Sequence, residues 1–259
     1  MNINFFSGIG SWELGLEIAQ SCFNIRSPHL FVDKSIEINP ISVNLYNSNF
    51  STNIVAEDIR TTIVNDKIDY AYISFPCTGT SIRGKREGLL NPDSALWHNA
   101  VSICYNNNAS TIFIEQPSGF INNGAIEVVL NLEEHGYKTT CLCLTARMFG
   151  LPHKRERIFI IASNTHNPHV KYWSESGWHD SFRASVKELI SFAGKPEIIT
   201  NECSYNHGIS HTRVYKHFDP VTDIFGVKRR SQLNRAELIN KYSLAIVPYC
   251  VASILSPYL

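Results

Sequence analysis

The chemically most informative residue of the sequence is Cys77, which stands in the segment Ser74-Phe75-Pro76-Cys77-Thr78-Gly79-Thr80-Ser81. A strand-like run over residues 68–73 precedes it, and Pro76 ends strand pairing because its nitrogen has no hydrogen to donate. Cys77 is therefore predicted just past the carboxyl end of a strand, the edge where open α/β sheets bind ligands. A thiolate there can attack electron-poor carbon. The alternative is that Cys77 is a small buried apolar residue.

Glycines and acids follow three other predicted strands. Gly8 and Gly10 precede a helix that is predicted to start near Ser11, and such a turn brings backbone amides close to a ligand. Glu37 and Asp58 stand at the ends of the second and third strand regions, and an acid near the first of these places hydrogen-bonds ribose in nucleotide-binding units. We expect one crevice for a nucleoside-containing cofactor. The alternatives are a plain strand–helix turn and solvated acids.

A carboxylate and two guanidinium groups follow later in the chain. Glu115 is predicted at a strand end before a turn-forming proline, where a carboxylate can protonate a ring nitrogen or orient a base. Arg155 and Arg157 share one face of an extended segment, since strand side chains alternate with a period of two. Two guanidinium groups on one face suit a carboxylate or a phosphate.

Basic residues recur where a nucleic acid would arrive. The segment 82–88 is polar, contains glycine, and carries three cations, so we expect a mobile loop over the pocket that meets a phosphate backbone. Residues 164–241 have weak periodicity and scattered aromatic and basic residues, which suits nucleic-acid contact. A solvated loop and plain surface residues are the alternatives.

The elements that must position these residues alternate between strand and helix. Strands are predicted at 30–33 with 36–39, 54–56, 68–73, 111–114, 138–145 and 157–162, and helices from Ser11 and at 40–49, 94–106, 124–135 and within 244–255. This order predicts an α/β fold with a doubly wound, mostly parallel sheet. The pair 138–145 and 157–162 is expected to form an antiparallel hairpin at the sheet's far edge.

Composition fits an ordinary globular protein. Of 259 residues, 44% are hydrophobic and 18% charged, and the formal net charge is zero. We expect no membrane span, no signal peptide and a cytoplasmic location. The seven cysteines include no C-x-x-C pair, so we expect reduced thiols and no metal site.

Taken together, these segments resemble the DNA (cytosine-5) methyltransferase family, in order over residues 4–163 and more loosely near the end of the chain. The segments that carry the resemblance are Phe5-Phe6-Ser7-Gly8-Ile9-Gly10 for the F-x-G-x-G cofactor motif, Glu37, Asp58-Ile59, Phe75-Pro76-Cys77 with Ser81 for the P-C-Q-x-x-S loop, Glu115 for the E-N-V motif, Phe149-Gly150-Leu151-Pro152 with Arg155 and Arg157 for Q-x-R-x-R, and Val247-Pro248-Tyr249 with Val251-Ala252 for the closing motif.

The sequence also departs from the family at supporting positions. The departures are Thr78 for Gln, Gln116-Pro117 for Asn-Val, His153 for Gln, Asp93 for an arginine after the loop, and Ser243-Leu244 for Gly-Asn. The catalytic groups themselves are kept. The departures therefore bear on rate and cofactor affinity more than on the type of reaction.

The resemblance implies transfer of a methyl group from S-adenosyl-L-methionine to carbon 5 of a flipped-out cytosine in a short specific DNA sequence, through a covalent Cys77 adduct. S-adenosyl-L-homocysteine would be the product. The implied catalytic residues are Cys77, Glu115, Arg155 and Arg157. The implied cofactor residues are Phe6, Ser7, Gly8, Ile9, Gly10, Ser11, Glu37, Ile38, Asp58, Ile59, Pro76 and Leu96, and the implied DNA contacts are Ser81, Arg83, Lys85 and Arg86.

The resemblance also implies an organisation and partners. We expect a methyltransferase (Rossmann-like) domain at 1–163, a small target-recognition domain at 164–241, and a C-terminal helix within 242–259 that returns to the first domain. The expected partner is double-stranded DNA, with a cognate restriction enzyme as a candidate, for a monomer encoded by a bacterium, an archaeon or a phage. Three alternatives stay open: a transfer-RNA cytosine-5 methyltransferase, a catalytically impaired DNA-binding homologue, and a thiol hydrolase that uses Cys77 with His153.

Overall fold

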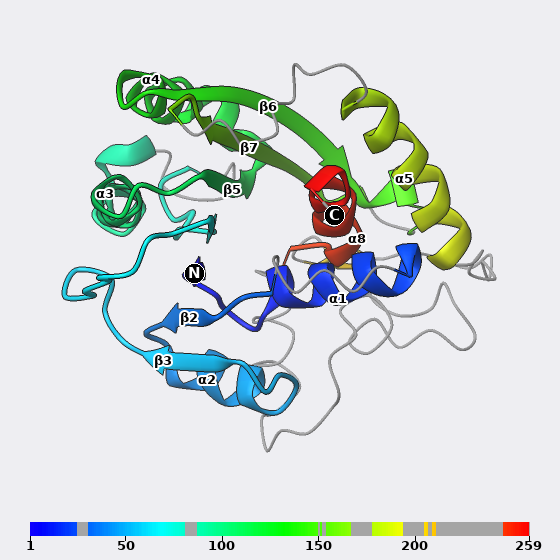
Figure 1. Cartoon of the computed structure of the whole chain (residues 1–259), viewed down its shortest axis with the longest axis horizontal. Coiled ribbons are helices and arrows are strands. Elements are labelled where there is room, and N and C mark those ends of the chain that lie inside the picture. Colours follow the sequence, from blue (N-terminus) through cyan, green and yellow to red (C-terminus); the bar gives the residue numbers. More distant parts are fainter. Residues whose placement is uncertain are drawn as a thin grey trace.

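Short apolar runs of the chain pair into one seven-stranded sheet in the order β3-β2-β1-β4-β5-β7-β6 (Figure 1). The structure is a computed structural model that describes residues 1–24, 31–80, 87–149, 151, 154–166, 178–193, 205–206, 209–210 and 246–258. The strands are β1 Asn2–Phe5, β2 Lys34–Glu37, β3 Asn53–Ala56, β4 Tyr70–Ile73, β5 Thr111–Pro117, β6 Tyr137–Thr145 and β7 Glu156–Asn164, and a separate pair is formed by β8 Tyr205–Asn206 and β9 Ile209–Ser210.

Helices connect the strands and cover both faces of the sheet. The α-helices are α1 Ser11–Phe23, α2 Pro40–Asn47, α3 Trp97–Asn106, α4 Ala125–Glu134, α5 Trp178–Ala193 and α8 Pro248–Leu255, and the short 3-10 turns are η2 Gly88–Leu90, η3 Ser94–Leu96, η4 Ser118–Asn122, η5 Ala146–Phe149 and η6 Ser256–Tyr258. In Figure 1, α8 lies against α1, and α5 packs on both of these helices. Within the described residues, no helix is both long and apolar enough to cross a membrane.

The register of the sheet aligns the strand ends that the sequence singled out. Strands β1, β2, β3, β4 and β5 are parallel, and Phe5 pairs with both Ile36 and Ile73. Ile73 in turn pairs with Ile114, so the residues that follow β1, β2, β4 and this part of β5 meet at one edge. Strand β7 runs antiparallel between β5 and β6. The predicted doubly wound sheet with an antiparallel hairpin is thus confirmed.

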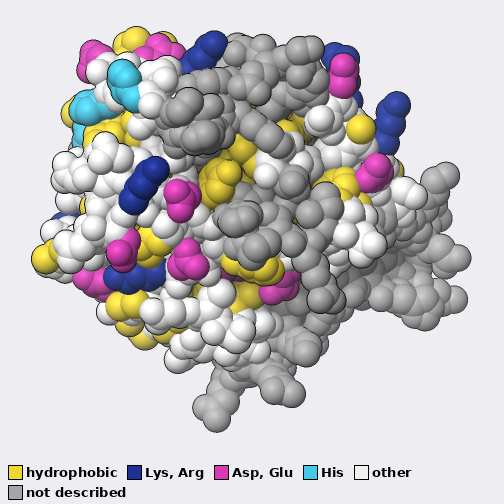
Figure 2. Space-filling view, in the orientation of Figure 1, with side chains coloured by type: hydrophobic (Ala, Val, Ile, Leu, Met, Phe, Trp, Pro, Cys, Tyr) yellow, Lys and Arg dark blue, Asp and Glu magenta, His cyan; other side chains and the backbone are white. Residues whose placement is uncertain are grey.

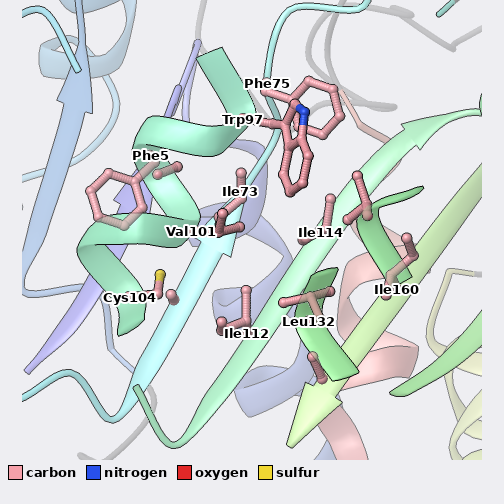
Figure 3. Packing of buried hydrophobic residues seen from close by; sticks show 14 of the residues in the cluster. Phe5, Ile73, Phe75, Trp97, Val101, Cys104, Ile112, Ile114, Leu132 and Ile160 are labelled. Carbon is pink, nitrogen blue, oxygen red and sulfur yellow. The ribbon is translucent and has the colours of Figure 1, made fainter. Parts of the chain in front are cut away.

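Alternation along the central strands divides the core into two layers. Ile112 and Ile114 face a cluster that includes Trp97 and Leu132, whereas Phe113 between them faces the cluster under the other helices. Figure 3 shows the first of these clusters, built between the sheet and helices α3 and α4. The second cluster joins the sheet to α1, α5 and α8. Both faces of the central strands are therefore buried. The two layers hold the sheet edge that carries the site in a fixed position.

The second strand differs from its prediction. It is a single strand at Lys34–Glu37, whereas residues 31–33 lie outside it and Leu30 falls outside the described residues. Asp33 instead accepts a hydrogen bond from the backbone nitrogen of Asn2 at 2.7 Å. The side chain of Asn39 caps α2 by accepting from the nitrogens of Ile41 and Ser42, so the strand ends at Glu37.

Two further bounds differ in detail. Strand β5 continues through Glu115 to Pro117, because antiparallel β7 extends beside it and Pro117 pairs with Arg157 at the last position. The helix that was expected at 94–106 begins as the 3-10 turn η3 and becomes α-helical at Trp97. The recognition domain predicted at 164–241 falls largely outside the described residues.

Candidate active site

The turn that carries Cys77 leaves the sheet directly after β4. Ser74 continues from Ile73, and its hydroxyl accepts a hydrogen bond from Trp12 Nε1 at 2.9 Å. Phe75 is buried in the cluster shown in Figure 3. Cys77 is half-buried. A buried aromatic residue two positions before the thiol thus anchors the turn while the thiol stays accessible.

Glu115 and the two arginines meet beside this turn. Glu115 pairs with Phe159 across the sheet and Pro117 with Arg157, so Glu115 and Arg157 are diagonal neighbours on one face. The Nε atom of Arg157 lies 2.9 Å from Oε1 of Glu115, and both side chains are largely buried. Arg155 is 8% exposed and has a left-handed backbone with φ of 29°. Left-handed backbone is uncommon outside glycine and often marks a functional segment.

Burial and charge act together on the proton affinities of these groups. Burial raises the pKa of the Glu115 carboxyl, and Arg157, Arg155 and a hydrogen bond from Ser74 oppose that rise. Burial also raises the pKa of the Cys77 thiol, Glu115 adds to the rise, and Arg157 and Arg155 oppose it. The four predicted catalytic residues are therefore within electrostatic reach of one another.

Burial and neighbouring charges also act on the pKa of the Arg155 guanidinium. Its burial and the neighbouring Arg157 lower its pKa, whereas Glu115 and Cys77 raise it. Arginine side chains are not deprotonated in folded proteins, so the Arg155 guanidinium is a cation. A thiol, a carboxyl and two cations together can activate an electron-poor ring: the thiol attacks carbon, the carboxyl holds a proton at a ring atom, and the cations stabilise charge.

The glycine turn after β1 has the shape expected of a ligand cradle. Phe6, Gly8 and Gly10 all have left-handed φ values, of 57°, 58° and 90°. A side chain at Gly8 would meet no atom within 4 Å, so the space above this residue is open. The backbone nitrogen of Gly8 donates to Glu37 at 2.9 Å, which joins the turn to the end of β2.

Acidic and apolar residues lie at the strand ends next to this turn. Asp58 follows β3 and accepts hydrogen bonds from Arg60, which lower the pKa of its carboxyl to about 2. Ile59 is buried beside it, and Ile38 after Glu37 is 62% exposed. Carboxyl oxygens that accept hydrogen bonds, beside an apolar surface, suit a nucleoside with hydroxyl and amino groups.

The residues present fit the cofactor that the sequence predicts. Among the described residues, Ser7 has a buried hydroxyl with no hydrogen-bond partner, directly beside the open space at Gly8. Glu37 and Asp58 supply acceptors at the same sheet edge. Pro76 and Leu96 are partly exposed, and Ser94, two residues before Leu96, donates to the carbonyl of Pro76. The expected cofactor positions are thus contiguous with the thiol turn.

Some expected residues lie outside the described part of the chain. These are the DNA contacts Ser81, Arg83, Lys85 and Arg86, the motif residues Gly150, Pro152 and His153, and the closing pair Ser243-Leu244. Ser11, another expected cofactor residue, is buried, and its hydroxyl accepts from the nitrogen of Ile246 at 3.2 Å. Ile9 is also buried.

The sequence interpretation gave no role to three polar residues that contact the thiol turn. Gln116 and Thr80 hydrogen-bond each other at 2.9 Å, and Ser94 contacts the turn from η3. Their partners lie 15 to 41 positions away in sequence, beyond any local pattern. The departure from the E-N-V motif at Gln116 was the only available signal.

Solved structures share this fold. The crystal structure of the S. pombe Dnmt2 methyltransferase superposes with a TM-score of 0.64 at 18% sequence identity, covering 98% of this chain and 97% of that chain. A structure of the Entamoeba histolytica methyltransferase EhMeth gives a TM-score of 0.62 at 15% identity, covering 99% of this chain and 96% of the other. At this identity the likeness establishes the fold alone.

Sequence relatives identify the family. The type II methyltransferase M.MspI of Moraxella sp is 33% identical over 179 residues, which are 66% of this chain and 40% of the relative. The type II methyltransferase M.NlaX of Neisseria lactamica is 30% identical over 176 residues, or 66% and 54% of the two chains. The matched region thus spans about half the length of these relatives. A family profile described as C-5 cytosine-specific DNA methylase matches residues 1–242, so the chain belongs to the C-5 cytosine-specific DNA methylase family.

Proposed function

We propose that this chain is an S-adenosyl-L-methionine-dependent DNA (cytosine-5) methyltransferase that acts through a covalent Cys77 adduct. The observation that carries the proposal is the convergence of the Cys77 thiol, the Glu115 carboxyl and the Arg155 and Arg157 guanidinium groups. They meet at the sheet edge that also holds the glycine turn. Family membership supports the same chemistry.

In this proposal Cys77 is the nucleophile. Carbon 5 of cytosine is a poor nucleophile by itself, and attack of the Cys77 thiolate on carbon 6 turns the ring into an enamine-like species that is nucleophilic at carbon 5. The bond between sulfur and carbon 6 forms as the π bond between carbons 5 and 6 breaks, and its electrons are delocalised over carbon 5 and ring nitrogen 3, which Glu115 protonates. After methyl transfer, a base removes the carbon 5 proton and the thiolate leaves.

Glu115 acts as the acid that holds its proton at ring nitrogen 3. Its raised pKa keeps that proton available closer to neutral pH than an ordinary carboxyl would. Arg157, at 2.9 Å from Oε1, fixes the orientation of the carboxyl. Arg155, fully enclosed beside them, holds the oxygen of the base or a phosphate.

The cofactor would lie along the crevice from the glycine turn to Asp58. S-adenosyl-L-methionine supplies an electrophilic methyl group and leaves as S-adenosyl-L-homocysteine. The residues that would hold it are Phe6, Ser7, Gly8, Ile9, Gly10, Ser11, Glu37, Ile38, Asp58, Ile59, Pro76 and Leu96. The open space at Gly8, the buried Ser7 hydroxyl and the exposed Ile38 support this placement.

DNA is the substrate in this proposal. The target cytosine must leave the duplex because stacking hides carbon 6, at a cost of a few kcal/mol. Ser81, Arg83, Lys85 and Arg86 would contact the DNA as the segment 82–88 closes over the base. On the described part of the face in Figure 2, acidic and basic side chains are interspersed. Residues 164–241 would provide the remaining basic and aromatic contacts and choose the target sequence, and residues 242–259 would complete the first domain.

Base-resolved methylation sequencing of plasmid DNA tests the proposal. The plasmid is recovered from cells that express either the wild-type chain or Cys77→Ala at the same soluble level. We expect methylcytosine at one recurring short sequence in the first sample only. Unmodified DNA from soluble wild-type protein would overturn the proposal, and methylation of RNA in the same cells would redirect it to an RNA substrate.

A further inference from the structure

Gln116 bridges the two sides of the thiol turn. Its Nε2 donates to the carbonyl of Phe75 at 2.6 Å, and its Oε1 accepts from the hydroxyl of Thr80 at 2.9 Å. Gln116 is 2% exposed and Thr80 is fully buried. One side chain therefore binds the residue two positions before Cys77 and the residue three positions after it.

Ser94 forms a second bridge across the same turn. Its hydroxyl donates to the carbonyl of Pro76 at 2.8 Å and accepts from the backbone nitrogen of Gly79 at 3.0 Å. Ser94 is also fully buried. Inside these bridges, the nitrogen of Thr80 donates to the carbonyl of Cys77 at 3.2 Å. Two independent side chains thus hold the residues on each side of the thiol.

The first bridge also connects the thiol turn to the acid. Gln116 follows Glu115 on β5, and neighbouring strand residues point to opposite faces of the sheet. Glu115 therefore faces the arginines while Gln116 faces the turn. Any shift of the turn relative to β5 changes the distance between the thiol and the carboxyl.

We propose that Gln116, Thr80 and Ser94 are positioning residues that hold the Cys77 thiol in its attacking geometry before DNA arrives. This inference rests on the proposed function. The three side chains are buried and hydrogen-bond the turn, so they would act through it. Gln116 departs from the E-N-V motif, and its side chain is long enough to hydrogen-bond both Phe75 and Thr80. In this proposal the departure helps to position the thiol.

The size of the effect follows from the geometric demand of nucleophilic attack. A misplacement of about 1 Å can lower a reaction rate about 100-fold. We expect Thr80→Val, which keeps the side chain's shape, and Ser94→Ala to lower kcat about 10- to 100-fold, with KM for DNA changed less than about threefold. Thr80→Ser retains the hydroxyl and is the matched control, with near wild-type kcat.

The closing experiment measures the formation of the covalent adduct in a single turnover. Wild type and each variant are mixed with cofactor and a duplex that carries 5-fluorocytosine at the target, and the trapped protein–DNA product is followed over time. The fluorine blocks proton removal from carbon 5, so the adduct persists. Melting temperature and cofactor affinity are measured on the same samples.

Slower adduct formation by Thr80→Val and Ser94→Ala, with unchanged melting temperature and cofactor affinity and with rescue in Thr80→Ser, supports the inference. Wild-type rates in both variants would overturn it, as would losses that only follow falling melting temperature across the set. If Thr80→Val alone fails to fold, Ser94→Ala decides. A wild-type protein that gives no adduct and no methylcytosine contradicts the proposed function instead, so the two failures are distinct.

Discussion

The thiol and the carboxyl of the site are electrostatically linked. The Cys77 thiolate and an ionised Glu115 would be two negative charges in a buried place. Ionisation of one therefore disfavours ionisation of the other. Arg157 and Arg155 counter this repulsion. The arrangement favours one state for attack, with Cys77 deprotonated and Glu115 protonated.

This linkage predicts how substitutions change the reactivity of Cys77. Glu115→Gln removes the neighbouring negative charge, so the pKa of Cys77 falls and its alkylation by iodoacetamide begins at lower pH. Arg157→Met removes a cation, so alkylation requires higher pH. Mass spectrometry of the Cys77 peptide over a pH series measures both shifts.

Exposed Cys141 provides the control in the same samples, since its alkylation profile is expected to be unchanged in both variants. Opposite directions of shift for the two variants are the critical result. A Cys77 profile that moves the same way in both would contradict the linkage.

Methyl transfer by Glu115→Gln is expected to fall about 100- to 10,000-fold, since the general acid is lost.

At the scale of elements, a buried acid joins the helices and strands on both sides of the glycine turn. Glu13 of α1 is 5% exposed and accepts hydrogen bonds from Asn4 of β1, Ser35 of β2 and Tyr46 of α2. Burial raises the pKa of this carboxyl, against the opposing effect of those bonds. Four elements thus share one side chain whose charge is costly in this place.

Glu13→Gln is predicted to weaken the dependence of stability on pH. The folded-state pKa lies above the unfolded value of about 4.3, so wild type binds more protons when folded and loses stability as pH rises through the interval between the two values. Gln keeps an acceptor for the three donors and does not titrate. The variant's free energy of unfolding should therefore gain on wild type as pH rises above about 4.3.

Urea unfolding at several pH values measures that difference, with Glu127→Gln on the exposed face of α4 as the control. Parallel pH curves for wild type and Glu13→Gln would refute the assignment. Glu13→Leu should be much worse at every pH. It strands three buried donors, and each costs about 1 kcal/mol or more.

A glycine sets the approach of α1 to α8. A Cβ built on Gly15 would overlap Cβ and Cγ1 of Val251, closer than folded proteins allow. Alanine is ordinarily about 1 kcal/mol better than glycine inside a helix. Gly15→Ala is nevertheless predicted to lower the free energy of unfolding by about 1–3 kcal/mol, because overpacking outweighs propensity.

The double variant Gly15→Ala with Val251→Gly tests the cause of that loss. Glycine at position 251 removes both the Cβ and the Cγ1 atoms that the new Cβ would overlap, so the pair should be more stable than the sum of the single effects predicts. Denaturant unfolding of all four proteins measures the coupling. Additive effects would show that the contact is not responsible.

For the molecule as a whole, features that depend on the order of the strands could be predicted from the sequence. Features that depend on contacts between residues distant in sequence could not. The carboxyl ends of parallel strands share an edge, so Cys77 and Glu37 could be placed together from sequence alone. The start of β2 was missed because Ser35 looks like a loop residue. Its buried hydroxyl hydrogen-bonds Glu13 and Tyr46, which are distant in sequence. The bridges from Gln116 and Ser94 likewise join residues that no local pattern connects.

Residues 246–258, the last described segment, pack against the helix that follows the first strand. Residues 246–258 lie beyond the matched family region of 1–242, yet α8 packs on α1 and contributes to the core beneath β5 and β7. It also reaches the site. Burial raises the pKa of the Cys250 thiol, Arg157 opposes that rise and Glu115 adds to it.

Truncation after residue 245 is therefore predicted to abolish the fold of the whole chain. The lost segment includes five buried aliphatic side chains: Ile246, Val247, Val251, Ile254 and Leu255. Each contributes about 1.5–3 kcal/mol on burial, so their sum of about 7–15 kcal/mol equals the net stability of an ordinary domain, about 5–15 kcal/mol. Circular dichroism with urea unfolding compares the truncated and full chains. Cooperative unfolding of the truncated chain at the full chain's midpoint would contradict this account, and it would mean that the sheet edge carrying Cys77 and Glu115 is stable without the helix behind it.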